Sequence, residues 1–267
     1  MKRILIFIIF ISTFSNISSQ AIYSDYLAGN RTYCPKPTDE RSLKIYNLGI
    51  ECVQRNQRLD AAFAFFAEMI EKDNSFCDAY FWAGYTLRLS NKNKEAVIFF
   101  DAADSLAQNK SIEFKQNLAT TCMILGLDKY AREKYEELVK YFPYSPEGYY
   151  GIALTSTTIG DVEYGLENLN IAETKYKTLN EDVQFLKAIL LTLNGKHQES
   201  LRYYDSSSTK FARNDNFKSH YAFSLYQVGL LNNKKKLLKT AREYYSNVVY
   251  KNQVREEIRV LFEEKNE

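Results

Sequence analysis

The side chains best suited to acid–base or metal chemistry are few in this chain and lie far apart. There are two histidines, His197 and His220, and neither has a cysteine or carboxylate nearby in a metal-ligand pattern. No H-E-x-x-H, G-x-S-x-G, Walker A or G-x-G-x-x-G motif is present. The sequence therefore indicates no catalytic residue, no metal site and no cofactor, and it favours a protein without enzymatic activity.

Four cysteines could carry redox chemistry or form disulfides: Cys34, Cys52, Cys77 and Cys122. No C-x-x-C pair occurs, and four thiols allow three complete pairings among which the sequence does not choose. Cys52 and Cys122 fall at equivalent apolar helix positions, where a buried free thiol is the simpler interpretation. If one bridge forms, Cys34 is its favoured member, with Cys77 as a candidate partner.

Two further charged groups are interpreted as structural. Acidic residues recur near the starts of expected helices, where they favour the positive end of the helix dipole. They are Asp78, Glu113, Glu147 and Asp182. A run of three lysines, 234–236, is typical of a solvated helix face.

Residues 1–21 have the pattern of a secretory signal peptide. Lys2 and Arg3 precede an apolar run of eight residues, 4–11, and Ser19-Gln20-Ala21 offers a cleavage site. Eight apolar residues are too few for a membrane span of ~20. We expect a periplasmic or secreted protein with no transmembrane segment in the mature chain; an uncleaved anchor or a buried first helix is the alternative. Without Lys2 and Arg3 there are 33 basic and 33 acidic residues, a balance that disfavours nucleic-acid binding.

The rest of the chain carries an internal repeat of 34 or 35 residues. One column of small residues holds Gly49, Gly84, Ala119, Ala153, Ala188 and Ala222. Seven residues after each lie Asn56, Asn91, Gly126, Gly160, Gly195 and Gly229. Five further on lie Ala61, Ala96, Ala131, Gly165, Ser200 and the exception Lys234. A large apolar column follows after four more, with Phe65, Phe100, Tyr135, Leu169, Tyr204 and Leu238.

Each column has a physical cause. Asn or Gly ends a first helix in the left-handed conformation. The two small columns let a second, antiparallel helix approach closely, and the large residue fills the space between them. This pattern, and the segments 131–143 and 194–204 in particular, resembles the tetratricopeptide repeat (TPR) family. The chain departs from it at Lys115, Gln184 and Lys218, where the family often has a large residue.

The resemblance implies an all-α fold, an α-α superhelix or TPR solenoid of about six helix–turn–helix repeats plus a C-terminal capping helix. The solenoid is expected over residues 42–267, with repeats near 42–75, 77–110, 112–145, 146–179, 181–214 and 215–250 and a cap at 252–264. Residues 22–41 do not fit the repeat and are expected to form an irregular arm. The arm could be disordered, or its tyrosines could pack on the first repeat or in the groove.

The resemblance also places a concave groove along the first helices. Its lining is the residue three before each small residue and the one just after it, and nine of these twelve positions are apolar or aromatic. Gln116, Thr120 and Ser219 are the polar ones. Arg88 lies one turn beyond Tyr85, and no groove position is Lys or Asn, which excludes the family's carboxylate clamp. The predicted groove residues are Tyr46, Ile50, Phe81, Tyr85, Arg88, Tyr150, Leu154, Phe185, Ile189 and Phe223.

An apolar, tyrosine-rich groove suits a peptide, a helix or another protein surface. The leading hypothesis is a non-enzymatic, exported adaptor or scaffold that binds a protein or peptide partner there. The alternatives are a self-associating structural component of an envelope assembly and, third, an enzyme or small-ligand protein on a solenoid scaffold. Burial of the same residues by the superhelix, the arm or a dimer is the competing interpretation of the groove.

Overall fold

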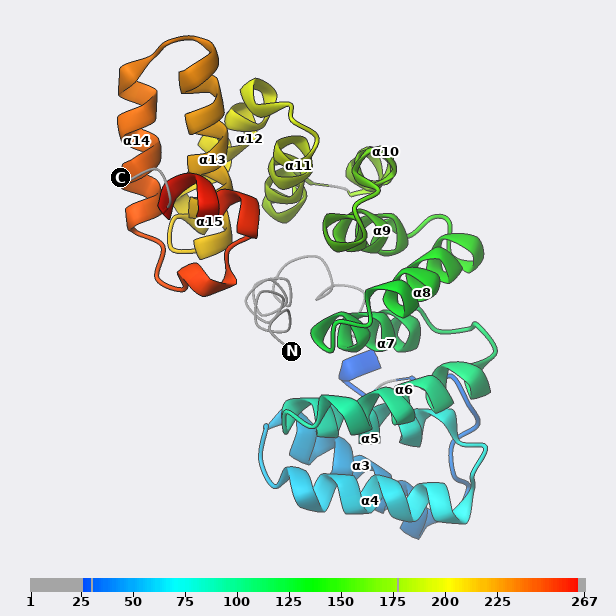
Figure 1. Ribbon diagram of the computed structural model, residues 1–267. Coiled ribbons are helices and arrows are strands. Elements are labelled where there is room, and N and C mark those ends of the chain that lie inside the picture. The colour runs from blue at the N-terminus through cyan, green and yellow to red at the C-terminus, as the bar shows by residue number, and fades with distance from the viewer. Residues whose placement is uncertain (1–25, 30, 177, 264–267) are drawn as a thin grey trace. The chain divides into compact units, whose positions relative to one another are not determined.

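The computed structural model describes residues 26–29, 31–176 and 178–263, without the side chains of 207–210. The predicted signal peptide lies outside these residues. The described chain is helical and has no strand, and successive helices pack in series as antiparallel pairs (Figure 1). This confirms the all-α repeat fold. None of the described helices is both long and apolar enough to cross a bilayer.

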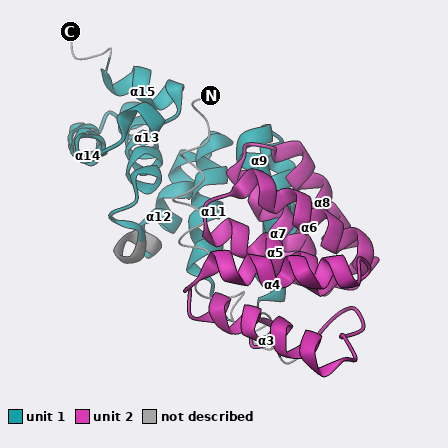
Figure 2. Ribbon diagram, turned by 90° about the horizontal axis from the view of Figure 1, so that it is seen from below, with its two compact units in different colours: residues 1–12, 149–267 teal, residues 13–148 magenta. Residues whose placement is uncertain are grey.

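The chain divides into two compact units (Figure 2), one ending at Gly148 and the other running from Tyr149. Unit 2, the N-terminal one, contains α3 (Glu40–Gln54), α4 (Leu59–Lys72), α5 (Cys77–Leu89), α6 (Asn93–Ala107), α7 (Ile112–Ile124), α8 (Asp128–Tyr141) and the first turn of α9 (Pro146–Ile159). Unit 1 contains the rest of α9, α10 (Val162–Lys175), α11 (Glu181–Leu193), α12 (His197–Phe211), α13 (Asp215–Leu231), α14 (Lys235–Ser246), a 3₁₀ turn (Lys251–Gln253) and α15 (Glu256–Glu263).

The first helices end where the sequence predicts in five of the repeats. Asn56, Asn91, Gly126, Gly160 and Gly195 all have positive φ. The prediction is wrong in the sixth repeat, where α13 continues past Gly229 and the positive-φ residue is Asn233 (φ 51°). Gly229 is needed there for close approach, because a Cβ would lie 2.8 Å from Leu238 Cδ2.

The register of the second helix is also wrong in the first repeat. The fully buried residues of α4 are Ala62 and Phe66, each one position after the predicted Ala61 and Phe65. The turn is one residue longer here and contains a second left-handed residue, Arg58. The second helix α4 begins three residues after Asn56, whereas α6 begins two residues after Asn91. A Cβ at Gly49 would lie 2.7 Å from the Phe66 ring, so the small-against-large packing itself is confirmed.

The last repeat departs further. Ala241 and Tyr245 are buried where the predicted columns have Lys234 and Leu238. The apolar face of the expected cap packs on them: Ile258 and Phe262 of α15 are buried, with Val254 and Leu261 partly buried. The Phe262 ring stacks on Tyr245 at a centroid distance of 4.5 Å.

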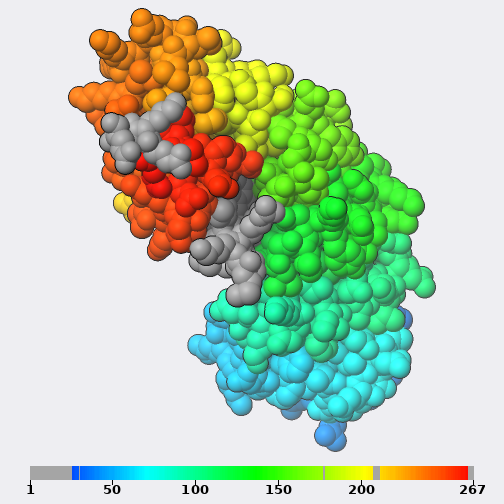
Figure 3. All heavy atoms as spheres, in the orientation of Figure 1, coloured from blue at the N-terminus to red at the C-terminus, as the bar shows by residue number. Residues whose placement is uncertain are grey.

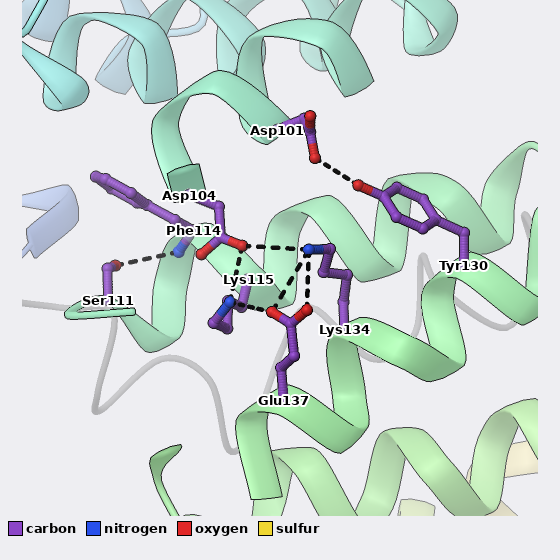
Figure 4. A network of polar contacts seen from close by, with 8 residues as sticks. All are labelled: Asp101, Asp104, Ser111, Phe114, Lys115, Tyr130, Lys134 and Glu137. Atoms are coloured by element: carbon purple, nitrogen blue, oxygen red, sulfur yellow. Dashed lines mark hydrogen bonds and ion pairs between the residues drawn. The ribbon is translucent and has the colours of Figure 1, made fainter. Parts of the chain in front are cut away.

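A buried ionic network explains why Lys115 occupies a position that usually holds a large side chain. Its ammonium group, only 1% exposed, bonds Asp104 of α6 at 2.8 Å and Glu137 of α8 (Figure 4). Lys134 adds an ion pair to Glu137 at 3.2 Å. The network therefore ties α7 to both neighbouring helices by charge-assisted hydrogen bonds instead of apolar contact.

Candidate functional site

The N-terminal arm packs on α5 and α7 of unit 2. Tyr26 is fully buried, stacks on Trp82 at 5.7 Å and meets the edges of Phe81 at 5.1 Å and Phe114 at 5.7 Å, all measured between ring centroids. Tyr33 also contacts Phe114, at 5.2 Å. Among the alternatives for the arm, the described part thus lies on the predicted groove residue Phe81, in the second and third repeats.

Asp78, in the first turn of α5, holds this arm because its carboxylate accepts hydrogen bonds from three donor groups of the arm. The Tyr26 hydroxyl donates to Oδ1 at 2.8 Å, and the Cys34 amide donates to Oδ2 at 2.8 Å. The Tyr33 amide lies 3.1 Å from both oxygens. Burial raises the pKa of Asp78, although these hydrogen bonds oppose the rise. Burial and the neighbouring carboxylate raise the pKa of Tyr26 well above its ordinary value.

Glu113 occupies the same position in α7 and is also buried. It accepts from the Arg31 guanidinium at 2.8 Å, from the Tyr33 hydroxyl and from Ser111 Oγ at 3.0 Å. Asp78 and Glu113 therefore have a structural role, as predicted, but their partners are arm residues and not the helix dipole alone. The sequence signal that could have found this is the arm itself, because it carries both donors and aromatic rings.

A disulfide joins the arm to α5. Cys34 and Cys77 are bonded with their Cα atoms 5.7 Å apart, which is one of the pairings left open by the sequence. Cys52 and Cys122 are free, the first half-buried and the second buried. Burial raises the pKa of the Cys122 thiol to about 12, so it is unreactive. Cys34, Cys77 and Asp78 lie close enough to share a metal ion, but both sulfur atoms are used in the disulfide.

The predicted groove residues of unit 2 fall into two groups. Tyr46, Ile50 and Phe81 are buried in the core, and Ile50 lies under Gly29 of the arm. Tyr85 and Arg88 are half-buried, with the guanidinium 4.8 Å from the Tyr85 ring centroid. Gln116 and Thr120, the polar positions of this face, are half-buried too. Of the predicted groove residues in unit 2, Tyr85 and Arg88 therefore keep exposed surface, and partner binding by them stays a prediction.

In unit 1 the predicted groove residues are mostly interior. Tyr150, Leu154, Phe185 and Ile189 are buried, and Phe223 is half-buried with its ring against His197. Phe185 stacks on Phe211 at 4.4 Å and lies 5.8 Å from Phe217, which places it among α11, α12 and α13. Partner binding by these residues stays a prediction.

The acids near the starts of the first helices, Asp78, Glu113, Glu147 and Asp182, are called the acid column below. Glu147, in the first turn of α9, belongs to this column but has a different environment from Asp78 and Glu113. It is 6% exposed, and Gln116 Nε2 donates to its Oε2 at 3.1 Å. Within the part of the chain that the structure describes, its other oxygen, Oε1, has no hydrogen-bond partner, and neither has Gln116 Oε1. Burial raises the pKa of Glu147 to about 7, against the hydrogen bond from Gln116. Its position in the repeat is the same as that of Asp78 and Glu113, and no sequence signal distinguishes it from them.

The two histidines lie in different helices of unit 1. His220, on α13, is buried with Nδ1 2.9 Å from the Asn216 carbonyl oxygen, so this nitrogen carries the proton. Burial lowers the pKa of His220 to about 4. His197 begins α12, is half-buried and has Nδ1 3.5 Å from the Ser224 hydroxyl oxygen.

Solved structures of other proteins share this fold. No protein-family model matches the chain, and no curated protein matches it. Among solved structures, a tetratricopeptide repeat protein from Parabacteroides merdae is similar at 16% identity, over 84% of this chain and 98% of its own, with a TM-score of 0.62. MamA from Desulfovibrio magneticus matches at 15% identity, over 64% and 95%, with a TM-score of 0.58.

A third structure is YrrB, described as a TPR protein with an unusual peptide-binding site. It matches at 14% identity, over 74% of this chain and 97% of its own, with a TM-score of 0.54. At these identities the similarity establishes the fold. The chain has the helical-repeat fold of tetratricopeptide repeat proteins, as the sequence resemblance implies.

Proposed function

We propose that this protein is a non-enzymatic scaffold that binds a peptide or helix of a partner protein on the first-helix face of unit 2. One observation carries the proposal: this face already holds a segment of the protein's own chain, from residues 26–29 and 31–34. The segment is held by aromatic packing on Phe81 and Phe114 and by hydrogen bonds to Asp78 and Glu113. A partner segment would use the same kinds of contact beyond the arm.

The half-buried residues next to the arm are suited to such a contact. Tyr85 with Arg88 stacked on it offers an aromatic surface and a cation, and these residue types are enriched among the residues that dominate protein interfaces. The similar protein YrrB is described as having a peptide-binding site, which supports this class of function.

Export to the periplasm or the outside of the cell belongs to the same proposal. The apolar run at residues 4–11 supports it. The Cys34–Cys77 disulfide supports it independently, because disulfides persist in oxidising compartments.

The test is a crosslinking pull-down with the purified protein from the envelope fraction of its own cells. The double variant Tyr85→Ala/Arg88→Ala alters the open part of the face, whereas Phe81→Ala would create a core cavity, since Phe81 is fully buried. Ile98→Ala on α6 is the matched control, because Ile98 is 69% exposed on the second helix of the same repeat.

We expect the double variant to lose a partner that the wild type and Ile98→Ala both capture. Equal capture by all three proteins would exclude this face as the binding surface. Recovery of the protein alone, together with a dimer in sedimentation, would favour the self-associating envelope component.

A further inference from the structure

We propose that Glu147 and Gln116 form a recognition site in unit 2 for a positively charged side chain, lysine or arginine, of the bound partner segment. The inference rests on the proposed function, since it names the chemistry that the peptide must carry. Three observations lead to it: the acid column, the unmet acceptors at Glu147 and the position of Gln116.

The acid column already shows how an acid at this position is satisfied. Asp78, Glu113 and Glu147 each lie six residues before the small residue of their repeat. Asp78 receives the Tyr26 hydroxyl and two arm amides. Glu113 receives the Arg31 guanidinium at 2.8 Å, with the Arg31 side chain 49% exposed and the Glu113 side chain 1% exposed. An arginine from a non-helical segment reaching a buried acid is therefore a contact that this column makes within the molecule.

Glu147 is the next acid in line, and the described chain gives it no such donor. Its only side-chain hydrogen bond is from Gln116, and no basic group of the described residues forms an ion pair with it. Two acceptor oxygens of this hydrogen-bonded pair, Glu147 Oε1 and Gln116 Oε1, are thus buried without donors from the described residues. Buried polar atoms are nearly always hydrogen-bonded in folded proteins, so these two indicate a missing donor.

The missing donor is best supplied by a cation. A guanidinium or ammonium group carries several N–H donors and can satisfy both oxygens while neutralising the carboxylate. A water molecule would satisfy the hydrogen bonds and leave the charge. A single carboxylate with one amide is a poor ligand set for a divalent ion, which prefers six or more oxygen ligands.

The site borders the predicted groove. Gln116 is half-buried and lies on the same side of α7 as the half-buried Thr120, whose hydroxyl is 3.4 Å from the Tyr135 hydroxyl. These are the polar positions in an otherwise apolar groove face of unit 2. A peptide lying on that face would therefore bury apolar side chains along most of it and meet one acidic position here.

The experiment measures binding of the purified protein to arrays of amphipathic 12-residue peptides that are identical except at one central position. That position is lysine, arginine, norleucine or glutamate. Glu147→Gln removes the charge and keeps the shape, and Glu133→Gln, an exposed acid on α8, is the matched control. A second measurement, which needs no variant and no peptide, follows the Glu147 carboxyl carbon by NMR during titration with n-butylguanidinium.

We expect lysine and arginine peptides to bind about tenfold more tightly than norleucine peptides, and glutamate peptides to bind least. In Glu147→Gln this preference should disappear while norleucine peptides bind as before, and Glu133→Gln should behave as the wild type. Peptide binding without a preference for a cation, or a preference that survives in Glu147→Gln, overturns the site.

If no peptide of any kind binds, the groove of the proposed function is wrong, and n-butylguanidinium decides the cation site alone. A saturable shift of the Glu147 carbon supports the site, and no shift overturns it.

Discussion

The two ends of the described chain are closed by different physical means. At the N-terminal end of unit 2 an irregular arm covers α5 and α7 through a disulfide, a buried carboxylate and a few aromatic contacts. At the C-terminal end of unit 1 a short amphipathic helix, α15, covers α13 and α14 by apolar burial of Ile258 and Phe262. The arm has no helical periodicity and so cannot present a continuous apolar stripe. Hydrogen bonds to Asp78 and the disulfide hold it in place instead. We call the arm and α15 the two caps: α15 covers the last helix pair, and the arm covers helices of the second and third repeats.

The largest effect is expected where the arm depends on one group. Asp78→Ala should lower the free energy of unfolding of unit 2 by about 4 kcal/mol, because two amides and the Tyr26 hydroxyl lose a buried acceptor. Urea denaturation followed by hydrogen exchange of α5 and α7 measures it. Unchanged protection of these helices would mean that the arm is not part of the cap.

Removal of the disulfide should have the next largest effect. Cys34→Ser opens a covalent loop with a sequence separation of 43 and should destabilise unit 2 by about 3 kcal/mol. The exchange rates of α13–α15 should not change. Equal destabilisation of both ends would show that the two caps are not independent.

The stability of the fold is expected to depend on pH through Glu147 of the acid column. Glu147 has a folded pKa of about 7, above its ordinary value of 4.5, so the folded state binds more protons between these values. Stability should therefore decrease as the pH rises through this range, by about 2.5 kcal/mol from about pH 5 to about pH 8. Glu147→Gln should remove this part of the pH dependence. A wild-type and variant difference that is constant with pH would contradict the unpaired state of the carboxylate.

The smallest effect is expected at the apolar cap. Phe262→Leu keeps an apolar side chain but loses the ring stacking on Tyr245, and we expect a loss of about 1 kcal/mol, confined to unit 1. Thermal unfolding with exchange at α14 and α15 measures it. A larger loss than that of Cys34→Ser would reverse the order of the two caps.

The periodic columns were enough to predict the helix pairs, because each column reports a local requirement: a left-handed helix end, a close approach, a filled gap. They failed where the turn length changes. The extra left-handed residue Arg58 moves the register of α4 by one, and the extension of α13 to Leu231 moves the last repeat. The shift in α4 leaves the columns unchanged, because Ala61 and Phe65 are each followed by an identical residue, and the shift in the last repeat shows only as the exception Lys234.

The site was harder to predict for a different reason. An acid at a helix start looks the same whether its partner is the helix dipole, an arm or nothing, so Asp78, Glu113 and Glu147 could not be told apart. The arm partners of Asp78 and Glu113 lie 44 to 82 residues away in the chain, and Glu147 Oε1 has no partner among the described residues. The groove residues Phe81 and Phe185 likewise have the right periodicity for a surface, but aromatic neighbours from other segments enclose them.

The bridge between Cys34 and Cys77 encloses the whole of the first repeat, since α3 and α4 lie between the two cysteines. A mechanical pull on the chain ahead of Cys34 is therefore transmitted through the sulfur atoms to α5, and the first repeat carries none of the load. Helical-repeat proteins come apart most easily from their ends, one repeat after another. In this protein such a pull does not act on the first repeat, whether that repeat is folded or not. Unfolding by force from this end must therefore begin at the second repeat.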